Sequence, residues 1–281
     1  MNLVLQGLAT DRTQVERIAA LAKAKRVVAI SERAFRCERV EFSPELKSLA
    51  ETAAFEAGLD CTFIEPGRRL ADFKLLAMDM DSTLITIECI DEIADMQGLK
   101  PEVAKITEAA MRGEIEFRES LTRRVALLKG LDANALQRVY DERLQLSPGA
   151  EALLAAARES GWKTLLVSGG FTFFTDRMKS RLGLDYTHSN VLEIADGKLT
   201  GRIVGNIVDA DEKKRTVERC CAELNISSRQ AIVMGDGAND LKMMHGAGLS
   251  VAFRAKPVVR AQADVALNFV GLDGILPLLA A

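Results

Sequence analysis

The sequence predicts an α/β protein: a Rossmann-like core on a parallel sheet, a helical cap inserted after the first core strand, and a smaller α+β unit at the N-terminus. Apolar runs of strand length recur after residue 73, and helical stretches separate them. Near-continuous apolar runs are typical of strands buried on both faces of a parallel sheet. The runs are LLAM, KTLLVS, AIVM and LSVAF.

The α+β unit is predicted for residues 1–65. Strand-like segments at 1–8, 26–30, 35–42 and 61–66 alternate with helical segments at 13–24 and 43–59, which gives the order βαββαβ. This order is that of the split, ferredoxin-like arrangement, and ACT-like regulatory domains resemble it. Ser43 is a suitable N-cap for the second helix, with Pro44 at its first position. PGRRLAD, residues 66–72, is predicted to be a linker to a second domain at 73–281.

The cap is predicted at about residues 86–146. Helical periodicity dominates this stretch, and it is too long for a simple crossover between neighbouring strands. Ser147-Pro148 then opens a further helix that ends at Gly161. The segment 191–204 alternates around Asp196-Gly197, which is a hairpin signal.

Composition excludes several classes of protein. The chain has 281 residues, 48% of them hydrophobic, and a formal net charge of -3, so no basic field indicates nucleic acid or an anionic membrane as partner. The N-terminus lacks the pattern of a signal peptide, and no apolar stretch approaches the length of a membrane span. Five cysteines without CxxC spacing and two histidines argue against zinc and favour reduced thiols in the cytoplasm. The sequence leaves monomer and homodimer open.

Polar residues follow three of the predicted core strands. LLAM ends in Asp79-Met80-Asp81, and AIVM is followed by GDGAND, which contains Asp236 and Asp240. Ligands of open parallel sheets bind at the carboxyl ends of the strands. If these strands are neighbours, four carboxylates share one pocket and require a cation. Oxygen ligands at this density suit Mg²⁺.

The third strand end indicates phosphate. Ser168 supplies a hydroxyl. The glycine-rich segment after it is expected to form a turn that leads into a helix and presents backbone N–H groups to an anion. Lys213 or the adjacent Lys214 could supply a positive charge. Neither a Walker P-loop nor a GxGxxG motif after a strand occurs in the chain.

These motifs together resemble the haloacid dehalogenase-like phosphatases. DMDST at 79–83, Ser-Gly at 168–169, a lysine and GDGAND at 235–240 occur in the order of the four family motifs. The likeness extends through Glu88 and the cap segment EAAMRGEIEFRESLTRRVALLKGL, and within the family this combination is similar to members that act on O-phosphoserine. It covers residues 73–275.

The resemblance implies a role for each matching residue. Asp79 would be the nucleophile that forms an aspartyl-phosphate, and Asp81 the general acid and base. Mg²⁺ would be held by Asp79, Asp81 and Asp236. Asp240 would not bind the metal but would orient the residues that do. In the family's VDAxxK spacing, the phosphate-binding lysine is Lys213.

Substrate binding is implied for a second group of residues. Glu88 would bind the substrate ammonium and Arg124 its carboxylate, with Met111 and Phe117 closing the pocket. The phosphoryl oxygens would be held by Ser168, Gly169, Lys213 and Asn239. The implied activity is Mg²⁺-dependent hydrolysis of O-phospho-L-serine, the last step of L-serine biosynthesis.

Alternatives remain at the level of the sequence. The same chemistry could act on another small phosphorylated metabolite, or transfer the phosphoryl group to a second alcohol. The chain could also be an amino-acid-binding regulatory protein whose phosphatase unit is incidental, although such a protein has no need of Asp81. By default Glu88 and Arg124 are surface charges, and Met111 and Phe117 pack inside the cap.

Overall fold

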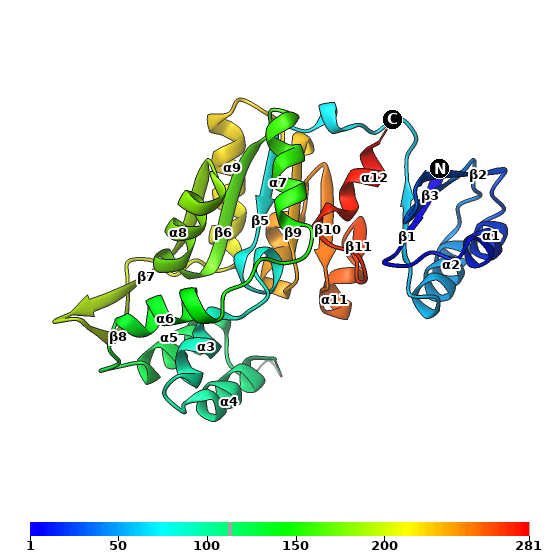
Figure 1. Cartoon of the computed structure of the whole chain (residues 1–281). Coiled ribbons are helices and arrows are strands. Elements are labelled where there is room, and N and C mark those ends of the chain that lie inside the picture. Colours follow the sequence, from blue (N-terminus) through cyan, green and yellow to red (C-terminus); the bar gives the residue numbers. More distant parts are fainter. Residues whose placement is uncertain (112–113, 281) are drawn as a thin grey trace.

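The computed structural model describes residues 1–111 and 114–280, and for Met111 only the backbone. Within these residues the strands form two sheets (Figure 1). The strands are β1 (Asn2–Gln6), β2 (Arg26–Ser31), β3 (Ala34–Glu38), β4 (Asp60–Ile64), β5 (Leu75–Met78), β6 (Lys163–Phe171), β7 (Tyr186–Ala195), β8 (Lys198–Val204), β9 (Ala231–Gly235), β10 (Leu249–Phe253) and β11 (Val265–Leu267). The helices are α1 (Arg12–Leu21), α2 (Pro44–Glu56), α3 (Cys89–Asp95), α4 (Lys100–Met111), α5 (Phe117–Leu127), α6 (Asn134–Glu142), α7 (Ala150–Glu159), α8 (Thr172–Leu182), α9 (Ala210–Glu223), α10 (Leu241–Met244), α11 (Pro257–Arg260) and α12 (Leu276–Leu279).

The N-terminal unit is an antiparallel four-stranded sheet in the order β2-β3-β1-β4, which confirms the predicted βαββαβ pattern. Ser43 starts α2 as predicted, because its Oγ accepts a hydrogen bond from Leu46 N at 3.2 Å. Leu3 and Leu5 of β1 pack in a cluster with α1 and α2. Val4, between them, points to the opposite face and packs into the cluster of the larger unit. The four-stranded sheet is therefore covered on both faces.

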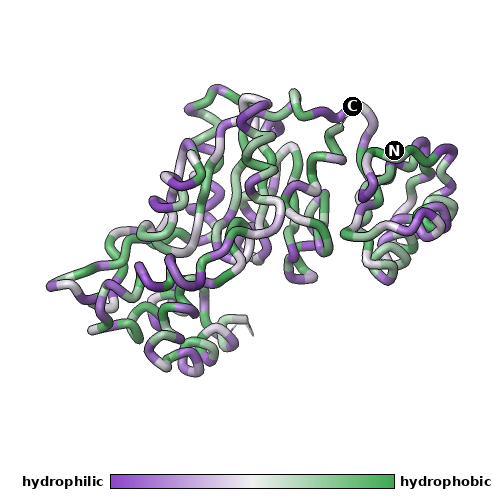
Figure 2. Tube along the Cα trace, viewed as in Figure 1, coloured by the Kyte–Doolittle hydropathy of each residue, from purple (hydrophilic) through white to green (hydrophobic). Residues whose placement is uncertain are grey.

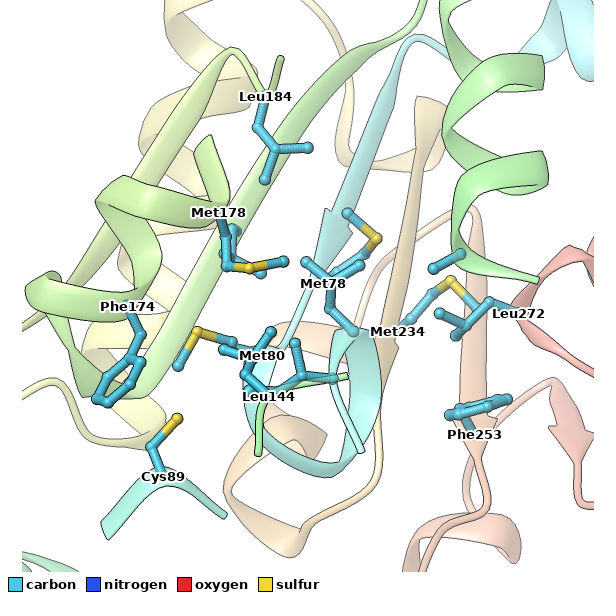
Figure 3. Packing of buried hydrophobic residues seen from close by; sticks show 14 of the residues in the cluster. Met78, Met80, Cys89, Leu144, Phe174, Met178, Leu184, Met234, Phe253 and Leu272 are labelled. Carbon is cyan, nitrogen blue, oxygen red and sulfur yellow. The ribbon is translucent and has the colours of Figure 1, made fainter. Parts of the chain in front are cut away.

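The core sheet has seven strands in the order β11-β10-β9-β5-β6-β7-β8, parallel except for the β7–β8 hairpin. The three strands with polar ends, β9, β5 and β6, are adjacent, as the sequence reasoning required. Leu76 and Met78 pack with residues of α7, α8 and α12, whereas Leu75 and Ala77 pack with residues of α9, α10 and α11. This alternation places helices on both faces of the sheet. Figure 3 shows the first of the two clusters around Met78.

The cap is formed by α3 to α6 and lies at the carboxyl ends of the core strands (Figure 1). The chain leaves and re-enters the core at one place, because Ile85 and Leu146 form an isolated antiparallel bridge. The β7–β8 hairpin turns at Asp196 and Gly197, whose φ angles of 50° and 74° suit a primed hairpin turn. Leu199 in β8 is hydrogen-bonded to the backbone next to α5, so the hairpin contacts the cap.

Apolar residues lie along the central strands of the core (Figure 2). Among the described residues, no helix combines the length and the apolar character needed to cross a membrane. All five cysteines are free thiols.

The two units meet through a buried carboxylate. Asp60 in β4 is 1% exposed and accepts hydrogen bonds from the backbone N–H groups of residues 268–270 at 2.7, 3.1 and 3.0 Å. The side-chain amide of Asn268 donates a further bond at 3.2 Å. Nearby, Arg36 in β3 donates to the carbonyl of Ala280 at 2.6 Å. The N-terminal unit thus holds the C-terminal segment of the core.

We predict that Asp60→Ala lowers the free energy of unfolding by at least about 3 kcal/mol, because several buried N–H groups lose their acceptor together. Asp60→Asn, which keeps one carbonyl oxygen, should cost less. The measurement is urea unfolding of the full chain followed by circular dichroism. Glu16→Gln, in an exposed pair with Arg12, is the control and should change little. An Asp60→Ala midpoint equal to that of the control would contradict this role.

Candidate active site

The site begins where β5 ends. Asp79 follows the strand, is 5% exposed, and its Oδ1 accepts hydrogen bonds from Met80 N at 2.7 Å and Lys213 Nζ at 2.8 Å. The chain then makes a single wide turn over Met80–Leu84, with Ser82 in the left-handed region at φ 56°. This turn places Asp81 beside Gly170 of β6. Asp81 Oδ1 is buried without a hydrogen-bond partner within the described residues.

Three carboxylates gather around one lysine. Carboxylate oxygens of Asp79, Asp236 and Asp240 lie within 4.8 Å of one another. Lys213 is fully buried, and its Nζ lies 2.8 Å from Asp79 Oδ1 and 2.7 Å from Asp240 Oδ1. Lys214 instead points outward and pairs with Glu218. Lys213 is therefore the lysine that the fold places at the carboxylates.

Asp240 also holds the loop that carries Asp236. Its Oδ2 accepts hydrogen bonds from Asp236 N at 3.1 Å and Gly237 N at 3.0 Å. Asp236 Oδ1 accepts from the Thr83 hydroxyl at 3.3 Å, which ties this loop to the turn after β5. Asn239 is half-buried and folds over Gly237. One buried carboxylate thus fixes both the lysine and the third acidic residue.

The electrostatics of this cluster favour a cation. Burial and the neighbouring Asp240 raise the pKa of Asp79 well above its usual value, although Lys213 opposes this. Burial and Asp240 also raise the pKa of Asp236, to about 7. Burial by itself would lower the pKa of Lys213, but Asp240 and Asp79 raise it above the ordinary value. One lysine does not balance two buried carboxylates and a third that is partly buried, so the cluster suits a metal ion with oxygen ligands.

Asp81 has a separate environment. Burial and the nearby charge of Glu88 raise its pKa to about 8. A Cβ at Gly170 would lie 3.0 Å from Asp81 Oδ2, so this glycine lets β6 approach the aspartate. Glu88 itself accepts a hydrogen bond from Ser82 at 2.7 Å and lies at the entrance to the cap. The turn after β5 therefore connects core and cap.

The segment after Ser168 differs from the expected turn. β6 continues to Phe171 and α8 starts at Thr172. The extension is held by Asn190 in β7, whose Nδ2 donates to Gly169 O at 2.8 Å and whose Oδ1 accepts from Val208 N at 2.8 Å. Asn190 was missed by the sequence reasoning. The signal for it is a polar residue that is 1% exposed in a strand, which becomes visible only in the fold.

Ser168 is fully buried, and its Oγ accepts a hydrogen bond from Gly170 N at 2.8 Å. Because that bond uses an acceptor lone pair, the Ser168 hydroxyl proton is free to donate to a ligand. A Cβ at Gly169 would lie 3.1 Å from Cζ of Phe117. The Phe117 ring at the start of α5 therefore covers the glycine beside Ser168.

The cap contacts the core next to this ring. Arg118 Nε donates to Asp209 Oδ2 at 2.6 Å, and Asp209 is the N-cap of α9, the helix that carries Lys213. Arg124 lies seven residues after Phe117, about two turns, and so on the same face of α5. Burial raises the pKa of Glu88, and the positive charge of Arg124 opposes this rise. The side chain of Met111, the remaining expected cap ligand, lies outside the described residues.

We predict that Gly235→Ala destabilises the protein by about 1–3 kcal/mol because an added Cβ has to displace a buried group. That Cβ would lie 2.4 Å from Asp240 Oδ2 and 2.6 Å from Asp240 Cβ. Gly237→Ala is the matched comparison, since its Cβ would meet the rotatable end of Asn239 and should cost less. Urea unfolding of both variants checks this, and equal midpoints would refute the proposed crowding.

The chain matches a known protein family over most of its length. The model of the haloacid dehalogenase-like hydrolases matches residues 73–248, and a domain of unknown function (DUF4072) matches residues 3–48. A phosphoserine phosphatase of Polaromonas sp. is 60% identical over 226 residues, which are 79% of this chain and 96% of the relative.

Two solved structures cover nearly the whole chain. A HAD family hydrolase from Salmonella enterica serovar Typhi has a TM-score of 0.88 at 33% identity, covering 99% of this chain and 97% of that one. A probable phosphoserine phosphatase from Vibrio cholerae, unliganded, has a TM-score of 0.83 at 38% identity, covering 99% and 86%. The chain belongs to the phosphoserine phosphatases of the haloacid dehalogenase-like hydrolase family.

Proposed function

We propose that the chain hydrolyses O-phospho-L-serine to L-serine and phosphate through an aspartyl-phosphate on Asp79. The observation that carries the proposal is the arrangement of Asp79, buried beside Lys213 at the end of β5, with Asp81 two residues further on. The 60% identity to a phosphoserine phosphatase supports the choice of substrate.

Asp79 is the proposed nucleophile. Within the described residues both hydrogen bonds to its carboxylate go to Oδ1, which leaves Oδ2 to attack phosphorus. The new bond joins Oδ2 to phosphorus while the bond from phosphorus to the serine oxygen breaks. Lys213 holds the carboxylate in place and offers its remaining proton to a phosphoryl oxygen. The Ser168 hydroxyl, the Gly169 N–H and the Asn239 amide are proposed to bind the other phosphoryl oxygens.

Asp81 is the proposed acid and base. Its Oδ1 has no partner within the described residues and is free to exchange a proton. It gives this proton to the departing serine oxygen. In the second half-reaction it takes a proton from a water molecule, whose oxygen attacks phosphorus and releases Asp79.

Mg²⁺ is the proposed cofactor, held by the side chains of Asp79 and Asp236 and by the Asp81 backbone carbonyl. The carboxylate cluster fits such an ion, because its oxygens converge and its charge exceeds that of Lys213. When bound, Mg²⁺ lowers the repulsion between Asp79 and the anionic substrate. Asp240 contributes by fixing the Asp236 loop.

The cap is proposed to select the substrate. Arg124 binds the carboxylate and Glu88 the ammonium of phosphoserine, while Phe117 and Met111 close the pocket.

We also propose that residues 1–65 and 73–281 are separate domains joined by 66–72, with the cap at about 86–146. The two sheets share no strand, and the Polaromonas relative is matched over 96% of its length by only 79% of this chain.

We predict that Asp79→Asn abolishes turnover of phosphoserine while the fold is kept, since an amide oxygen is a poor nucleophile. Asp81→Asn should slow both half-reactions, because it cannot carry a proton. Phosphate release by each purified variant is the measurement, with circular dichroism as the check on folding. Substantial phosphate release by the Asp79→Asn variant would contradict the covalent mechanism.

We predict that the protein with Mg²⁺ prefers phosphoserine over other small phosphorylated metabolites and p-nitrophenyl phosphate. Arg124→Ala should lower kcat/KM for phosphoserine by about 10²–10³-fold, because a buried ligand charge loses its partner. The effect on p-nitrophenyl phosphate, which has no carboxylate, should be much smaller. Arg123→Ala, the exposed neighbour, is the matched control. A wild-type protein without preference for phosphoserine would refute the proposed substrate.

A further inference from the structure

We propose that Ser82 is a positioning residue that fixes the carboxylate of Glu88 in the orientation needed to bind the substrate ammonium. The inference rests on the proposed phosphoserine phosphatase activity and adds a residue to which the family resemblance assigns no role. Ser82 lies in the turn that follows Asp79, and Glu88 is the N-cap residue of α3 at the start of the cap. One hydrogen bond joins the two side chains, from Ser82 Oγ to Glu88 Oε1 at 2.7 Å.

The backbone of Ser82 has an unusual conformation. Its φ and ψ angles are 56° and 2°, in the left-handed region that glycine adopts freely and that a residue with a Cβ adopts only at a cost in free energy. On conformational grounds alone, glycine would suit this turn better. Serine offers what glycine lacks, a hydroxyl, and that hydroxyl donates to Glu88. The contact with Glu88 therefore accounts for a serine at this position.

A backbone hydrogen bond fixes where the hydroxyl points. Ser82 N donates to Ile87 O at 3.1 Å, so the backbone and the side chain of Ser82 contact two consecutive residues at the start of the cap. The neighbouring Thr83 hydroxyl donates to Asp236 Oδ1 at 3.3 Å. The turn after Asp79 thus holds the acidic loop on one side and Glu88 on the other, which places the proposed ammonium ligand relative to the proposed metal ligands.

The carboxylate of Glu88 is held by Ser82 and remains open to a ligand. Although Glu88 is the N-cap residue of α3, its side chain does not cap the helix, and among the described residues Ser82 is the one donor to its carboxylate. Glu88 keeps exposed surface, and a glutamate without a partner samples many rotamers. The bond to Oε1 selects one rotamer and leaves Oε2 for the ammonium, so less entropy is lost on binding.

A hydroxyl suits this task because it carries no charge. It donates one hydrogen bond to the carboxylate, and Glu88 keeps its negative charge for the substrate. A lysine or arginine at the same place would orient Glu88 too, but it would compete with the ammonium for the same carboxylate. Ser82 can therefore orient Glu88 without occupying it.

The test compares Ser82→Gly and Ser82→Ala on two substrates, with the full chain and Mg²⁺. Both variants lose the hydroxyl, but only glycine suits the left-handed conformation. With phosphoserine, both should raise KM by about 5–20-fold and change kcat little, as expected when ground-state binding is lost. With p-nitrophenyl phosphate, which has no ammonium, Ser82→Gly should stay within about threefold of wild type.

Thr200→Ala is the matched control. The Thr200 hydroxyl donates to the carboxylate of Glu193 at 2.5 Å in the β7–β8 hairpin, outside the proposed site. Its removal deletes the same kind of hydrogen bond and should leave KM and kcat for both substrates unchanged.

A double-mutant cycle separates positioning of Glu88 from support of the turn. Once Glu88 is replaced by Ala, Ser82→Gly should add almost nothing to the loss with phosphoserine. Additive losses, equal losses on both substrates, or a wild-type KM for phosphoserine in Ser82→Gly would each overturn the inference. These outcomes differ from failure of the proposed function, which would appear in the wild-type protein as no preference for phosphoserine.

Discussion

The site depends on one buried cation, Lys213, held between Asp79 and Asp240. A lysine with no exposed surface is tolerable only when carboxylates surround its ammonium group, and here two of them lie within 2.8 Å of Nζ. Asp240 in turn binds the backbone of the loop that carries Asp236. The strand end, the lysine helix and the acidic loop are thus fixed by one network, which leaves an excess of negative charge for a metal ion to balance.

The residues proposed for phosphate chemistry and those proposed for substrate recognition belong to different layers of the molecule. The core supplies the groups proposed to meet a phosphoryl group, at the carboxyl ends of adjacent strands and, for Lys213, in α9. The cap supplies Glu88, Phe117 and Arg124, and it joins the core at the Ile85–Leu146 bridge and at the Arg118–Asp209 pair. Because Asp209 caps the helix of Lys213, this pair connects the cap to the helix that carries the buried lysine.

The N-terminal unit makes buried contacts with the core. Its sheet buries Val4 and Ile64 against the core, and Asp60 holds a backbone segment 208 to 210 residues away. These contacts involve strand β11 and the C-terminal segment, at the end of the core sheet away from the cap hairpin. Any signal from this unit to the site has to pass through the core strands rather than through a direct contact with the cap.

The sequence by itself determined the α/β class, the βαββαβ unit, the presence of a helical cap and the core strands that lead to Asp79, Ser168 and Asp236. Local periodicity and motif spacing encode these features directly. Only the tertiary structure decided between Lys213 and Lys214, extended β6 through Ser168–Phe171, and brought in Asn190. These depend on contacts between elements far apart in the chain, because whether a polar side chain is buried and what it then meets are set by packing, which sequence spacing does not record.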